Sequence, residues 1–383
     1  MTPARVLALG LLLLLPGRPA RAQEKPEVAA YRYGVRARLA KTNAEALDYL
    51  SRSLALFPDP IIFSNRGDLK ARLKDIPGAI ADYDKAIELK PGDPDLHANR
   101  GLLKHRAADL AGAIADYDRV VELKPSALVH NNRGYARITQ GDRAGAIADY
   151  SKAVALSPKT AKYRENLANA RRDQGDIAGA IADHDQIVAL DPNNPLRYFF
   201  RGELKQLQGE FGGAIKDYDK LLALKPDAWG GYIQRGAARQ SQGDLEGALS
   251  DYDKAVSGNP EHDDFGWAYR EIVLRRLKRG TPDAELSKIA AKGKAGFPND
   301  IVLYLSGTLA ESDFLAKAGQ GDAAIVPEQQ CTAFYFAGMT KLLAGDRAAG
   351  RKLLEQSVAT KRSLVIEFGL ARAELARLAK PAP

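Results

Sequence analysis

The chain has 383 residues, of which 45% are hydrophobic and 27% are charged, and this balance excludes an intrinsically disordered polymer. Its 56 basic and 48 acidic residues give a formal charge of +8, which raises nucleic-acid binding as a possibility to test. The single cysteine, Cys331, excludes a disulfide framework and a metal site built from several cysteines.

Residues 1–22 have the pattern of a secretory signal peptide. Arg5 precedes the apolar run from Val6 to Leu15, and Ala20-Arg21-Ala22 is a small-x-small cleavage site. Ten helical residues span about 15 Å, half of the roughly 30 Å that a bilayer requires, so a retained anchor is the weaker alternative. We expect cleavage after Ala22, a mature chain that starts at Gln23 with no cysteine for lipid attachment, and a periplasmic or secreted protein.

Cleavage also changes the charge argument. It removes three arginines and no acid, so 53 basic minus 48 acidic residues leaves +5. The remaining Lys and Arg residues are not clustered with aromatic residues, and the mature chain has no apolar run long enough to span a membrane. The sequence therefore predicts no nucleic-acid partner and no transmembrane segment.

Next along the chain comes an internal repeat of 33 or 34 residues. The motif Asn-Arg-Gly starts at Asn65, Asn99 and Asn132. The second motif, Gly-Ala-Ile-Ala-Asp-Tyr, starts at Gly78, Gly112 and Gly145, and near-copies start at Gly179, Gly213 and Gly247. Self-similarity at this period, with paired helical patterns, indicates a stack of helical hairpins.

This repeat closely resembles that of the tetratricopeptide repeat (TPR) family. The resemblance implies an all-α, right-handed TPR solenoid, a superhelix of antiparallel helix pairs, closed by a C-terminal helical cap. Each repeat is numbered so that Gly67 stands at position eight and Ala79 at position twenty of the second repeat. Small residues at these two positions let the paired helices approach closely, and a proline near each repeat end, such as Pro91, stops the second helix. The predicted repeats cover 27–59, 60–93, 94–126, 127–160, 161–194, 195–228 and 229–262.

The C-terminal third is less regular. Residues 263–328 are predicted as a degenerate helical hairpin followed by linker helices, and residues 329–383 as a terminal TPR-like hairpin with a capping helix from Val365 to Leu378. This part resembles bacterial envelope TPR lipoproteins that act as adaptors, recruiting a periplasmic protease and cell-wall hydrolases. The resemblance is carried by Leu303 to Gly307, Cys331 to Gly338 and Val358 to Thr360. Gln23, in place of the lipidated cysteine, is a departure from that group.

No catalytic motif is present in the sequence. It lacks a nucleophile elbow, a phosphate-binding loop and a His-Glu-x-x-His zinc helix, so we expect neither an enzyme nor a cofactor. His97, His130 and His184 fall at packing positions, and Cys331, Trp229 and Trp267 are also predicted to be buried, with a reactive thiol as the alternative for the cysteine. His262 is expected in a loop. An aspartate at position twenty-three and an arginine at position seven predict an ion pair within each repeat that has both.

The concave face of the superhelix is the candidate site, because in TPR proteins positions two, five, six, nine, twelve and thirteen line it. Position six is asparagine in four successive repeats, which resembles the asparagine ladder by which some TPR superhelices hold the main chain of an extended peptide. A side-chain amide both donates and accepts, so it can pair with any peptide unit. The alternative is that these amides bond only within their own helix or to water. The predicted ladder is Asn65, Asn99, Asn132 and Asn166, flanked by Arg72, Arg106, Arg172 and His105, with Phe199 as an aromatic anchor.

These observations favour a non-enzymatic exported scaffold that binds extended peptides or partner proteins of the bacterial cell envelope along the groove. A second hypothesis is a permanent subunit of an envelope export or polysaccharide assembly. A third, weaker one places an enzyme or regulatory domain in residues 263–383, which lack paired catalytic groups.

Overall fold

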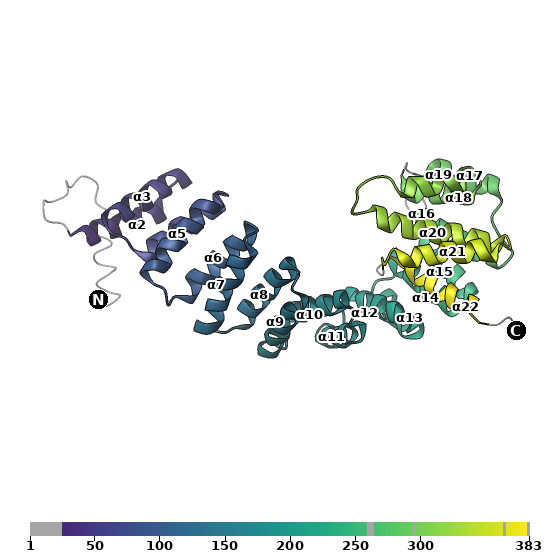
Figure 1. Cartoon of the computed structure of the whole chain (residues 1–383), viewed down its shortest axis with the longest axis horizontal. Helices are drawn as coiled ribbons and strands as arrows, with labels where there is room; N and C mark the ends of the chain where they lie inside the picture. Colours follow the sequence, from purple (N-terminus) through teal and green to yellow (C-terminus); the bar gives the residue numbers. More distant parts are fainter. Residues whose placement is uncertain (1–24, 259–263, 294–295, 363–364, 381–383) are drawn as a thin grey trace. The chain divides into compact units, whose positions relative to one another are not determined.

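The computed structural model describes residues 25–258, 264–293, 296–362 and 365–380. The predicted signal peptide, Gln23 and His262 lie outside the described residues. Within them, every regular element is an α-helix and no strand occurs, so the predicted all-α TPR solenoid is confirmed (Figure 1). The chain divides into two compact units, one up to Ala170 and one from Arg171 onward, and each is described by itself.

The first unit consists of consecutive antiparallel helix pairs. Up to residue 156, each first helix packs against the second helix of its own repeat, and successive pairs pack on one another. The helices are α2 (Pro26–Leu39), α3 (Asn43–Leu56), α4 (Pro60–Arg72), α5 (Ile76–Leu89), α6 (Pro94–Arg106), α7 (Leu110–Leu123), α8 (Ala127–Gln140), α9 (Arg143–Leu156) and the greater part of α10 (Ala161–Gln174).

The second unit continues the pairs and then changes character. The continuing helices are α11 (Ile177–Leu190), α12 (Pro195–Gln208), α13 (Phe211–Leu224), α14 (Trp229–Gln242) and α15 (Leu245–Gly258). They are followed by α16 (Asp264–Arg276), α17 (Asp283–Lys292), α18 (Phe297–Leu305), α19 (Glu311–Ala318), α20 (Val326–Leu343), α21 (Arg347–Ala359) and α22 (Ile366–Leu378). Here α18 packs against both α16 and α17, and α22 packs against α14, α20 and α21.

Close approach of the paired helices depends on small residues facing a tyrosine. Ala146 and Tyr150 are almost fully buried against α8. A Cβ added to Gly134 would lie only 2.8 Å from a ring carbon of Tyr150, which is closer than side-chain atoms tolerate. The small position and the aromatic position of the repeat therefore act together to set the spacing of the two helices.

Both ends of the turn between paired helices are capped. Gly141 ends α8 in the left-handed region at φ 94°, a conformation that glycine adopts without a Cβ penalty. The next residue, Asp142, accepts a hydrogen bond from the Gly145 N–H at 2.9 Å and so caps the start of α9. The Gly-Asp pair thus predicts the turn correctly.

The predicted ion pairs between arginine and aspartate form. In the five repeats that have both residues, a guanidinium Nη2 lies 2.5–2.6 Å from the carboxylate: Arg66 with Asp82, Arg100 with Asp116, Arg133 with Asp149, Arg201 with Asp217 and Arg235 with Asp251. Four of these arginines also reach back to a carboxylate of the preceding repeat, as Arg100 does to Asp84 at 2.8 Å. Each such arginine therefore links two repeats. Residues 161–194 have Leu167 at position seven, and there Arg171 holds Asp183 at 2.6 Å.

Most of the predicted buried residues are buried. His97, His130 and His184 are each 7% exposed, and Cys331 is buried with its Sγ 3.4 Å from Ser357 Oγ. Burial raises the pKa of the Cys331 thiol, which opposes the reactive-thiol alternative.

The prediction for Trp229 is wrong, because its side chain is 37% exposed. Trp229 is the first residue of α14, and it stacks on Tyr232 at a centroid distance of 6.3 Å. Trp267 is half-buried.

Candidate peptide-binding groove

The first unit carries the asparagine ladder on its first helices. In α4, Asn65 lines a hollow together with Asp68 and Arg72. In α6, Asn99 lines the neighbouring hollow together with Arg106. Positions six, nine and thirteen are spaced i, i+3 and i+7, so they lie on one helical face. The structure therefore brings the first two asparagines and the two predicted arginines together along this face.

The other two asparagines have neighbours of their own kind. Asn166 Nδ2 donates to Asn131 Oδ1 at 2.6 Å, and Asn131 Nδ2 lies 3.4 Å from Asn132 Oδ1. Asn131 stands at position five, one residue before the ladder. The Asn131–Asn166 bond runs between repeats, an arrangement that neither the peptide-binding hypothesis nor its intrahelical alternative includes, whereas the Asn131–Asn132 contact lies within α8. A peptide at this end of the ladder would have to compete with the Asn131–Asn166 bond.

Asp68 and Tyr83 form a polar contact at the edge of the hollow. The Tyr83 hydroxyl donates to Asp68 Oδ1 at 2.5 Å. Burial and this neighbouring carboxylate raise the pKa of Tyr83, while a hydrogen bond from Asn99 acts in the opposite direction. Tyr83 therefore remains a neutral donor, and Asn99 lies within reach of it.

Two exposed apolar side chains lie at position nine of the first unit, and our sequence analysis did not select them. Leu102 is 49% exposed and Tyr135 is 56% exposed. His105, a predicted site residue, packs against Tyr135 with the rings tilted by 37° and 5.0 Å between their centroids. Exposed large apolar residues on a groove face are typical of binding surfaces. The signal that could have found them is position nine itself, which lines the concave face in the TPR pattern.

The two remaining predicted site residues belong to the second unit. Arg172 pairs with the adjacent Asp173 at 2.9 Å. Phe199 is partly buried and packs edge-on against Tyr218, with a centroid distance of 6.3 Å. Its neighbour Phe200 exposes 44% of its side chain. The structure thus gives Phe199 a packing role, and its part in binding stays a prediction.

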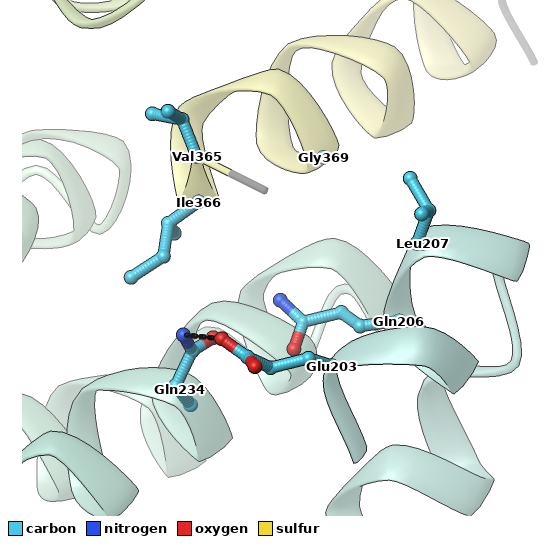
Figure 2. A pocket seen from close by; sticks show the side chains of 7 residues that line it. All are labelled: Glu203, Gln206, Leu207, Gln234, Val365, Ile366 and Gly369. Carbon is cyan, nitrogen blue, oxygen red and sulfur yellow. Dashed lines mark hydrogen bonds between the residues drawn. The ribbon is translucent and has the colours of Figure 1, made fainter. Parts of the chain in front are cut away.

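In the second unit, the C-terminal helix covers the faces of α12 and α14 that correspond to the ladder face. Val365, Ile366 and Gly369, at the start of α22, close a small cavity of about 30 Å³ over Glu203 and Gln234 (Figure 2). Arg372 donates to the Leu207 carbonyl at 3.2 Å. Arg377 donates to the Gln240 and Ser241 carbonyls at 2.6 and 2.8 Å, which satisfies backbone acceptors at the end of α14.

Glu203 lies beneath this helix, and the pKa of its carboxyl group is raised. Gln234 Nε2 donates to its Oε1 at 3.3 Å, the bond drawn in Figure 2. Burial raises the pKa of Glu203 to about 7, although the charge of Arg172 acts to lower it. Closure by α22 thus favours the protonated carboxyl.

Two features are absent from the described residues: a cluster of metal ligands and a membrane-spanning helix. They contain no group of three or more His, Cys, Asp or Glu side chains that could hold a metal ion. None of the helices built from them is both long and apolar enough to cross a bilayer.

Comparison with known proteins supports the repeat directly. A family model described as "TPR repeat" matches residues 67–107, and a second, described as "Tetratricopeptide repeat", matches residues 131–195 and 201–263. A search of curated proteins finds no match.

Solved structures match part of this chain and more than nine tenths of their own length. The C-terminal part of a TPR repeat-containing protein from Cytophaga hutchinsonii is 17% identical, with 68% of this chain and 97% of that chain covered and a TM-score of 0.47. YrrB, described as a TPR protein with an unusual peptide-binding site, is 20% identical over 51% of this chain and 97% of its own, with a TM-score of 0.42. MamA is 25% identical over 42% of this chain and 94% of its own, with a TM-score of 0.38.

These TM-scores are all below 0.5, so the assignment rests on the family models and on the repeat itself. The matched segments fall within the predicted run of repeats, residues 27–262, apart from the last matched residue. The chain is a tetratricopeptide repeat protein.

Proposed function

We propose that the protein is an exported, non-enzymatic scaffold of the cell envelope that binds extended segments of partner proteins along the groove of its first unit. The observation that carries the proposal is the row of asparagines on one face, accompanied by exposed Leu102 and Tyr135. An extended peptide leaves its main-chain N–H and C=O groups unpaired, and side-chain amides satisfy both kinds of group. The exposed apolar pair would add side-chain contacts to this main-chain recognition.

The groove of the first unit suits a partner better than the equivalent face of the second unit. In the second unit, α22 already lies over α12 and α14 and uses their backbone acceptors. In the first unit, Leu102 and Tyr135 still expose about half of their surface. A partner would therefore gain more apolar burial there.

The test is recovery of partners from an envelope extract with immobilised protein. We compare wild type with a variant carrying Asn→Ala at 65, 99, 132 and 166. A matched control carries alanine at Lys85, Glu88, Arg119 and Glu122, four exposed residues of α5 and α7 that form ion pairs with one another and leave the net charge unchanged. We expect the asparagine variant to lose its partners and the control to keep them. Unchanged recovery by the asparagine variant would refute the ladder, provided that both variants retain wild-type circular dichroism.

Export is a separate part of the proposal, supported by the charged start, apolar run and small-x-small site of residues 1–22. Mass spectrometry of the protein recovered from its native cells tests it. A mature N-terminus at Gln23 in the periplasmic or secreted fraction is expected, and an intact N-terminus in the cytoplasm would contradict it.

A further inference from the structure

Five exposed basic side chains line the hollows of the first unit without an acidic partner. Arg38, Arg72 and Arg106 occupy the last turns of the successive first helices α2, α4 and α6, and Lys41 and Lys74 follow the first two of these helices. In the described part of the chain no carboxylate forms an ion pair with any of the five. By contrast, cations at positions seven and eleven, such as Arg100 and Lys104, are paired with Asp116. The five basic residues, which we call the basic rail, are therefore free to meet an external anion.

The rail is continuous because its hollows share a residue. Arg38, Lys41 and Arg72 line the first hollow, and Arg72, Lys74 and Arg106 line the second. The acid that lines both hollows is Asp68, whose carboxylate already accepts a hydrogen bond from Tyr83 at 2.5 Å. Each hollow thus presents three cations against one engaged carboxylate, and its potential is positive.

The rail also ends at a defined place. In the following repeat, position thirteen is Thr139, which is neutral and donates to the Tyr135 carbonyl of its own helix at 2.9 Å. Leu102 and Tyr135, the exposed apolar residues, lie at this end. The groove of the first unit is therefore basic along α2, α4 and α6 and apolar from α6 to α8.

We infer that the basic rail binds acidic side chains of the bound segment that are spaced about three residues apart. A bulky apolar residue further along the same segment would contact Leu102 and Tyr135. First helices of successive repeats lie on the order of 10 Å apart. A peptide in the polyproline II conformation advances about 3.1 Å per residue with three residues per turn, so every third side chain returns to the same face and meets the next arginine. Arginine binds carboxylates through charge-assisted and often bidentate hydrogen bonds. This inference rests on the proposed function, because the asparagines must hold the main chain in the groove.

The test uses three pools of 12-residue peptides, amidated at the C-terminus and carrying an N-terminal fluorophore. The pools place Glu, Gln or Lys at every third position and randomise the others. Amidation removes the terminal carboxylate, so only internal acids can contribute. Fluorescence anisotropy measures binding to the mature protein, to R72Q/R106Q, and to K152Q/K159Q, a control that loses two exposed charges of the same sign outside the hollows.

Wild type and K152Q/K159Q are expected to bind the Glu pool about tenfold more tightly than the Gln pool, and R72Q/R106Q to lose this preference. Raising the salt concentration should shrink the difference, since the rail is exposed and screened by ions. If the Glu and Gln pools bind equally and the asparagine variant abolishes this binding, the proposed role of the basic rail is wrong. The proposed binding of peptides in the groove is then still supported. A preference that persists in R72Q/R106Q would also overturn the role of the rail. Absence of binding by every pool would overturn both the rail and the proposed groove.

Discussion

At the scale of the residue, the carboxylate of Asp149 shows how each repeat is held together. Nitrogen donors of Arg133, Arg137 and His130 lie 2.6–3.1 Å from its oxygens, and its side chain is 3% exposed. Such a group has no access to water to replace a lost partner. The Arg and Asp positions could be predicted from the sequence because both recur once per repeat, whereas the second cation at position eleven escaped notice because it alternates between Lys and Arg.

Neutralising this carboxylate should therefore be costly. We expect Asp149→Asn to lower the free energy of unfolding by about 3 kcal/mol, because two guanidinium groups lose the buried carboxylate that they share. Urea unfolding followed by circular dichroism measures the change.

The matched control is Asp48→Asn, which breaks an exposed i, i+4 pair with Arg52 on α3. We expect no measurable effect there. Equal stability of the Asp149 variant and wild type would show that the buried network is not a structural requirement.

At the scale of the element, α22 is the helix that the repeat alone does not explain. Its existence could be predicted from the periodic apolar residues between Val365 and Leu378. The surface against which it packs could not be predicted, because the contact between Arg377 and the Gln240 carbonyl joins residues 137 positions apart, outside any repeat period. The repeat pattern therefore gives no sign that α22 covers the corresponding faces of α12 and α14.

The carboxyl beneath α22 predicts a pH dependence. The pKa of Glu203 is raised to about 7 in the folded protein and is near 4.3 when unfolded, so the folded state binds the proton more tightly. Its contribution to stability is therefore full at low pH and falls as the pH rises from about 4.3 through about 7. Buried Glu367, on α22 itself, also has a raised pKa and acts in the same direction.

The variant Glu203→Gln imitates the protonated side chain. We expect it to be more stable than wild type at pH 8, to match wild type at about pH 4, and to reduce the loss of stability between these values, as measured by urea unfolding. Glu374→Gln, on α22 and in an ion pair with Arg276, is a control that should not flatten the profile. A wild-type pH profile in Glu203→Gln would show that this carboxyl is not desolvated by α22.

At the scale of the whole molecule, repetition makes the chain predictable and also limits what can be predicted. The helix pairs follow from local patterns that recur through residues 27–262, and Gly-Asp pairs mark the turns at 141–142, 175–176 and 243–244. These patterns do not identify the partner, because every TPR groove is built from the same repeat pattern and only the residues that line the groove differ. In this chain the distinguishing residues of the first unit are the asparagine ladder, the basic rail, and the exposed pair Leu102 and Tyr135.

The measurement that tests the central claim most directly is site-specific photocrosslinking in the native cells. A photoreactive residue replaces Leu102, half-exposed in the groove of the first unit, or Lys152, exposed on α9 outside its hollows. The groove hypothesis predicts a crosslinked partner protein at position 102 and none at position 152. Equal crosslinking at both positions, or crosslinking at position 152 alone, would contradict it.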